Sequence, residues 1–160
     1  ATKAGSTREV ADAVARTLRE HGLEADLRPA DEVGTLAPYG AVVLGTAIYT
    51  GRVHKHARLF LRDHRAELAE RPLAVFGMGP QTTAVKDVEA SRAQLDHALG
   101  AVPELDPQLV AIFGGAVDPG RLRFPFNRMP ASDAREWAAI EAWAAALTPA
   151  RARSGAAVGS

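Results

Sequence analysis

The chain has 160 residues, of which 47% are hydrophobic, and its 19 basic and 19 acidic side chains give a formal net charge of zero. This balance argues against a nucleic-acid-binding protein and against a polybasic membrane anchor, and the absence of cysteine excludes disulfides, thiolate metal sites and a cysteine nucleophile. No apolar run reaches the roughly 20 residues that span a bilayer, and no signal peptide is recognisable, so we expect one cytoplasmic globular domain.

The first predicted element is a helix over residues 8–21, because apolar side chains recur there every four residues. Ser6 or Thr7 is its expected N-cap, with Glu9 three residues after Ser6 as in a capping box. Gly22 is a typical stop signal. The buried stripe is expected to consist of Val10, Val14 and Leu18.

Four stretches predict strands. The alternation over residues 23–27 suits a short strand near a sheet edge. Three apolar runs without alternation, at residues 41–46, from Leu73 and from Gln108, are typical of parallel strands buried on both faces.

Helices are expected between and after these strands, over residues 54–70 and 89–99, with a last helix capped by Ser132 or Asp133. Strands that alternate with helices at such lengths predict a doubly wound α/β sheet with helices on both faces. We expect one domain over residues 1–149 and a disordered tail over residues 150–160.

The opening loop, ATKAGST, combines hydroxyl groups with a glycine directly before the first helix. Thr2, Ser6 and Thr7 supply the hydroxyls, and Gly5 lets the backbone amides converge at the helix N-terminus, where an anion such as a phosphate monoester is favoured. The alternative is that Ser6 and Thr7 only cap the helix. The spacing matches neither the Walker pattern nor GxGxxG.

This loop resembles the flavodoxin phosphate loop, T/S-x-x-G-x-T, through Thr2, Gly5 and Thr7. GTAIYTGRVH, residues 45–54, is similar to the flavin-ring loop of the flavodoxin-domain protoporphyrinogen dehydrogenases, and LVAIFGGAVDPGRLRFPFNRM and DAREWAAIEAWA resemble later parts of that subfamily. The resemblance implies a flavodoxin-like sheet of order 2-1-3-4-5 and FMN as cofactor. It also implies that a strand should precede Thr2, and we expect a few apolar residues upstream to supply it.

The resemblance implies contacts between FMN and three loops that meet at the carboxyl ends of the strands. Tyr49 is the stacking candidate for the flavin ring, the alternative being a half-exposed loop aromatic. The residues so assigned are Thr2, Lys3, Ala4, Gly5, Ser6 and Thr7, then Thr46, Ala47, Ile48, Tyr49, Thr50 and Gly51, and finally Met78, Gly79, Pro80 and Gln81.

Histidines and arginines are the remaining candidates for chemistry. His54 matches a position of the subfamily after the ring loop, and three roles are open for it: relaying a proton, forming a hydrogen bond with the loop, or only ordering the start of a helix. His64 is expected to be a partly buried core residue. His54 and His56 lack the cysteine or acidic neighbours of a metal site, so no metal is expected. Three arginines among aromatic residues suit a carboxylated planar substrate, or else form a solvated loop: Arg121, Arg123 and Arg128.

Three functions remain open at this point. The resemblance implies an FMN oxidoreductase similar to protoporphyrinogen IX dehydrogenase of heme biosynthesis, passing electrons to a quinone or another acceptor, with peripheral membrane contact. The chain lacks the longer basic and apolar insertion that those dehydrogenases carry before the last helix. The alternatives are an electron-transfer module that serves a protein redox partner and an interaction domain without flavin. Neutral charge argues mildly against the electron carrier.

Overall fold

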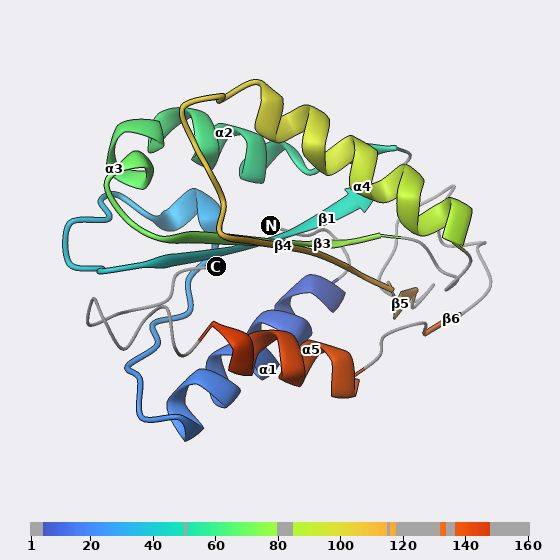
Figure 1. Cartoon of the computed structure of the whole chain (residues 1–160), viewed down its shortest axis with the longest axis horizontal. Coiled ribbons are helices and arrows are strands. Elements are labelled where there is room, and N and C mark those ends of the chain that lie inside the picture. The colour runs from blue at the N-terminus through green and yellow to red at the C-terminus, as the bar shows by residue number, and fades with distance from the viewer. Residues whose placement is uncertain are drawn as a thin grey trace.

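A layered α/β architecture is seen in the computed structural model, which describes residues 5–49, 51–79, 85–114, 116–117, 132–133 and 137–147. Two helices cover one face of a central sheet, and the other helices cover the opposite face (Figure 1). The described elements are α1 (Ser6–Glu20), the 3-10 helix η1 (Ala30–Glu32), β1 (Val42–Tyr49), β2 (Arg52–Val53), α2 (Lys55–Asp63), α3 (Arg65–Ala69), β3 (Leu73–Met78), α4 (Val85–Gly100), β4 (Leu109–Phe113), β5 (Ala116–Val117), β6 (Ser132–Asp133) and α5 (Trp137–Ala146).

The main sheet, as far as the described residues show it, has the order β2-β1-β3-β4. Strands β1, β3 and β4 are parallel, with Val42 opposite Leu73 and Ala74 opposite Leu109. The two residues of β2 form an antiparallel hairpin with the end of β1. The three apolar runs of the sequence are therefore adjacent parallel strands, and the expected α/β fold class is confirmed.

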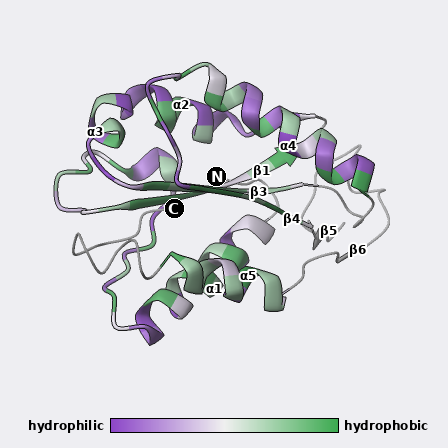
Figure 2. Ribbon diagram, in the orientation of Figure 1, coloured by the Kyte–Doolittle hydropathy of each residue, from purple (hydrophilic) through white to green (hydrophobic). Residues whose placement is uncertain are grey.

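Two apolar cores fill the spaces between the sheet and its helices. Hydrophobic strands lie between the helices; α2, α3 and α4 carry many hydrophilic residues, whereas α5 is hydrophobic along its length (Figure 2). On the α1 and α5 face, the predicted stripe of Val10, Val14 and Leu18 is at most 1% exposed. On the α2, α3 and α4 face, Leu61 and Leu95 are the corresponding buried residues. Because parallel strands bury both faces, each strand contributes side chains to both cores.

Residues 23–27 are not a strand, contrary to the sequence-based expectation. Leu23, Ala25 and Leu27 are partly buried against the α1 and α5 core, so the apolar alternation reflects packing alone. The backbone is held by side chains instead of a ladder: the Arg19 guanidinium donates to the carbonyl oxygen of Ala25, with Nε at 3.2 Å. No strand among the described residues pairs with this segment, which is the physical reason for the difference.

One predicted helix has different boundaries in the structure, and another is described only in part. Residues 54–70 form α2 and α3, which are separated at His64, where ψ is 13° and the helical backbone is interrupted. The last helix, α5, is described from Trp137. Ser132 and Asp133, its expected caps, form β6 and pair with β5. Their side chains and residues 134–136 lie outside the described residues, so the capping role stays a prediction.

Candidate functional site

The N-terminus of α1 and the carboxyl ends of β1 and β3 lie at the same edge of the sheet, on the right of Figure 1. Parallel strands with crossover helices bring these ends together, and ligands of doubly wound folds bind beyond this edge. The described residues of the three predicted loops therefore lie at this edge of the sheet.

The first turn of α1 is built differently from the sequence-based expectation. Gly5 is the N-cap, in the left-handed region at φ 83°, and no side-chain cap hydrogen bond is made at this helix start. The helix begins at Ser6, so Ser6 and Thr7 lie inside its first turn, and the expected capping role is wrong for both. The first hydrogen bond of the helix runs from the Glu9 amide to the Gly5 carbonyl at 3.1 Å. The amides that precede Glu9 in the first turn therefore have no acceptor within the helix and point out of its end.

Thr7 carries the clearest sign of a polar ligand. Its side-chain oxygen is buried, its residue is 2% exposed, and the oxygen finds no hydrogen-bond partner among the described residues. Ser6, at 8% exposed, is buried beside it. An unsatisfied buried hydroxyl costs about 1–3 kcal/mol, so a partner for it is expected. A phosphate fits, since its oxygens accept from both hydroxyls and from the amides of the first turn.

The end of β1 forms a tight hairpin. Ala47 is buried, and Thr46 is buried with its hydroxyl donating to the Ala47 carbonyl at 3.2 Å. Gly51 adopts φ 71°, a conformation that side chains disfavour, and lets the chain return as β2. Tyr49 pairs with Arg52 through the backbone. Ile48 is half-buried and packs against the α2, α3 and α4 core.

The end of β3 is pressed against α4. A Cβ on Gly79 would lie 2.6 Å from Oγ of Ser91, which is itself buried, so only glycine fits without a shift. The Gly79 amide donates to the carbonyl of Phe113 at 2.9 Å. Met78 is 2% exposed in the α1 and α5 core, so only its backbone faces the loop. The close approach of Ser91 to Gly79 was missed by sequence reasoning, because a serine within a helix gives no signal of a contact with a distant residue.

His54 begins α2 as its N-cap. Its Nδ1 accepts from the His56 amide at 3.2 Å, and its own amide donates to the Ala47 carbonyl at 2.9 Å. These contacts support the alternative in which His54 orders the start of the helix. Among the described residues, no group of three His, Cys, Asp or Glu side chains is arranged to hold a metal.

Other predicted site residues lie outside the described residues, and for Tyr49 only the backbone is described. These residues are Thr2, Lys3, Ala4, Thr50, Pro80, Gln81, Arg121, Arg123 and Arg128.

Carboxylates with a lowered pKa lie away from this edge. The Tyr39 hydroxyl, followed by Arg28, lowers the pKa of Asp26 in the segment after α1. In α3, hydrogen bonds from His64 and from the Leu36 amide lower the pKa of Glu67. Asp26 and Glu67 thus hold the segments after α1 and before β1 in place, and neither residue belongs to a predicted site loop.

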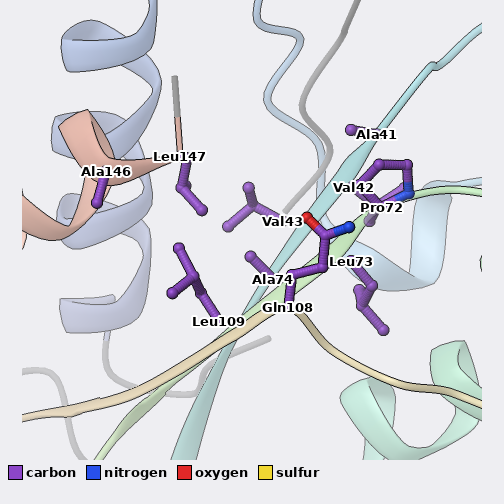
Figure 3. A pocket seen from close by; sticks show the side chains of 10 residues that line it. All are labelled: Ala41, Val42, Val43, Pro72, Leu73, Ala74, Gln108, Leu109, Ala146 and Leu147. Carbon is purple, nitrogen blue, oxygen red and sulfur yellow. The ribbon is translucent and has the colours of Figure 1, made fainter. Parts of the chain in front are cut away.

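A separate apolar cavity of about 310 Å³ lies where the parallel strands begin, at the opposite edge of the sheet. Figure 3 shows apolar side chains around it, with Gln108 as its polar member and Leu147 reaching in from the end of α5. The described side chains that line it include no hydroxyl and no cation that would favour an anion, and it lies at the wrong end of the strands for a cofactor of this fold.

Comparison with known proteins decides the family. The family model described as a flavodoxin domain matches residues 1–129. The chain belongs to the flavodoxin-domain family. Flavodoxin domains are flavin-binding electron-transfer domains, and the loop of this flavodoxin domain that precedes α1 lies within the matched range. No curated protein matches the chain. None of the described helices is long and apolar enough to cross a membrane.

Proposed function

We propose that this flavodoxin domain is a redox flavoprotein that binds FMN at the edge formed by α1, β1 and β3. The observation that carries the proposal is the buried hydroxyl of Thr7, which has no hydrogen-bond partner among the described residues and lies in a helix start without a side-chain cap. The alternative in which the loop hydroxyls only cap a helix loses its support. The same orphaned hydroxyl argues against an interaction domain without flavin.

Each loop has a distinct task in this proposal. Ser6, Thr7 and the first-turn amides bind the phosphate, and the helix dipole favours its negative charge. The backbone from Thr46 to Gly51 and from Met78 to Gln81 holds the ring, with Tyr49 as its stacking partner. When bound, FMN supplies the redox chemistry, and the protein supplies orientation and electrostatics.

The finer proposal is an oxidoreductase similar to protoporphyrinogen IX dehydrogenase, with electrons leaving to a quinone or another acceptor. It is supported by the resemblance of residues 45–54 to the ring loop of that subfamily. The runner-up is an electron-transfer module without a substrate of its own. Oxidation of protoporphyrinogen with a quinone would support the enzyme, whereas efficient reduction by a flavodoxin reductase without such turnover would support the module.

Thr7→Val tests the phosphate assignment, because it removes the hydroxyl and keeps the shape. The lost charge-assisted hydrogen bond contributes about 1.5–3 kcal/mol, so FMN should bind roughly 10- to 100-fold more weakly. Riboflavin, which has no phosphate, should bind the variant and the wild type equally. Fluorescence titration measures both ligands.

The flavin-free Thr7→Val variant should also be more stable than the flavin-free wild type, because an unsatisfied hydroxyl has been removed. We expect its free energy of unfolding, measured with urea, to be higher by about 1 kcal/mol. Thr17→Val, the same change at another buried threonine of α1, is the control and should leave FMN affinity unchanged. Equal FMN affinity of Thr7→Val and wild type would overturn the phosphate assignment.

A further inference from the structure

A second concave surface lies outside the flavin edge, between α2 and α4. This groove has a volume of about 680 Å³, within the range of small-molecule sites. The two helices lie on the same face of the sheet (Figure 1). The lining residues are Gly51, Arg52, Val53, Lys55, Arg58, Leu59, Leu61, Arg62, Gln94, His97, Ala98, Ala101 and Val102.

The charge of the groove is one-sided although the chain is neutral. Its lining holds three arginines, one lysine and one histidine, and no acidic residue. Arg52, Lys55 and Arg58 are exposed and have no ion-pair partner among the described residues. Arg62, by contrast, is bonded to Asp63 at 2.8 Å.

Four arginines outside the groove have a carboxylate partner. Arg8, Arg28, Arg65 and Arg92 each lie within 4 Å of a carboxylate. The first turn of α2 contains Lys55 and no acidic residue, although the helix dipole disfavours a cation there. Lys55 is therefore not placed to stabilise α2 through the helix dipole.

The floor of the groove is apolar. Val53, Leu61 and Val102 are at most 5% exposed, and Leu59 and Ala98 are half-buried. Removing an apolar ligand body from water against such a floor is favourable, and cations at the rim attract its charged end. An inorganic anion would contact only the cations at the rim of the groove, Arg52, Lys55 and Arg58. A neutral apolar molecule would contact only the apolar floor.

We propose that the groove between α2 and α4 binds an amphipathic carboxylate, a molecule with an apolar body and an anionic end. The groove begins at Gly51, the turn residue of the loop that the proposed function places along the flavin ring. A ligand here would lie beside that loop, but its binding does not require the flavin.

The probes are 1-naphthaleneacetate and its uncharged counterpart 1-naphthaleneacetamide, titrated calorimetrically into the full chain with and without FMN. The carboxylate should bind at least about tenfold more tightly than the amide, with a preference that shrinks at high salt. In Lys55→Gln/Arg58→Gln the preference should fall to about twofold or less. Both substitutions keep good helix formers in α2.

Two further variants give matched controls. Arg16→Gln, at an exposed arginine of α1 on the other face of the sheet, should leave carboxylate binding unchanged. Ala98→Phe fills the floor and should weaken both probes at least about fivefold. Equal binding of the two probes by the wild type, or an undiminished preference in the double variant, would overturn the proposal. FMN titration of the wild type and of the double variant separates the two hypotheses. A wild type that prefers the carboxylate but does not bind FMN would refute only the proposed flavin function, and a double variant that has lost the preference should still bind FMN like the wild type.

Discussion

Single side chains decide how neighbouring strands pack beneath the candidate flavin site. A Cβ on Gly45 would lie 2.3 Å from Cζ of Phe76. The Phe76 ring cannot move aside, because it is fully buried and packs against Phe113 at 5.9 Å and Trp143 at 5.7 Å between ring centroids. The strand that leads into the ring loop therefore requires glycine for space.

Gly45→Ala should destabilise the protein by about 1–3 kcal/mol, the usual cost of overpacking a filled core. Gly34→Ala is the control, since no atom lies within 4 Å of its added Cβ, and it should change stability by less than about 0.5 kcal/mol. Urea unfolding measures the free energy of unfolding of both variants and of the wild type. Adding Phe76→Leu to Gly45→Ala should restore part of the loss, and equal stabilities of the two alanine variants would contradict this account of the packing.

Between elements, side-chain hydrogen bonds add to the apolar contacts that hold the loop before β1 against α3. The Glu67 carboxylate in α3 accepts from the Leu36 amide at 2.8 Å, the Thr35 hydroxyl at 3.1 Å and His64 Nδ1 at 3.1 Å. His64 Nε2 lies 3.2 Å from the Val33 carbonyl. The predicted partly buried state of His64 is confirmed, and its ring joins α3 to the loop before β1.

Stability should depend on pH through Glu67, because these hydrogen bonds lower its pKa from the usual 4.5, with the bond from His64 first and that from the Leu36 amide second. A depressed folded pKa contributes stability above the unfolded pKa, and this contribution is lost as the pH falls through the folded pKa. The stability difference between wild type and Glu67→Gln should thus be constant near pH 6 and shrink below about pH 4.5.

Glu70→Gln, at an exposed neighbour, controls for general acid effects and should show a smaller change with pH. Urea unfolding at several pH values measures the three proteins. A Glu67→Gln difference that stays constant down to pH 3 would contradict the assigned role of the hydrogen bonds.

Over the whole molecule, the two cores are joined through the same strands. Leu95 is fully buried on the α4 side, whereas Trp143 lies on α5 in the opposite core. Phe76 and Gly77 are adjacent in β3 and belong to opposite faces, as their contacts with Trp143 and with Ile112 and Leu95 show. We therefore expect the two cores to unfold together.

Leu95→Ala should destabilise the fold by about 2–5 kcal/mol, the usual cost of a large-to-small change at a buried leucine. Tryptophan fluorescence, which reports α5 because both tryptophans lie there, should shift to lower urea by the same amount as far-UV circular dichroism. A fluorescence transition that stays at its wild-type midpoint would show that the two cores unfold independently.

The sequence alone determined the features that depend on local pattern. Apolar runs identified β1, β3 and β4 as parallel strands, and a four-residue spacing identified the buried stripe of α1. Burial on both faces is confirmed for β3, whereas residues 109–112 of β4 are only partly buried. These elements were predictable because burial on one or both faces determines the spacing of apolar residues along the sequence. The approach of three loops at one edge followed from the parallel topology.

Tertiary structure alone decided features that depend on where distant groups lie. The pattern at residues 23–27 reads as a strand, but no described partner pairs with it. Ser6 and Thr7 read as caps, but the φ of Gly5 places them inside the helix and leaves the Thr7 hydroxyl without a described partner. The cations of β2 and α2 meet the apolar side of α4 only in the folded chain. Hydrogen-bond satisfaction and charge proximity are properties of positions in space, and sequence spacing does not specify them.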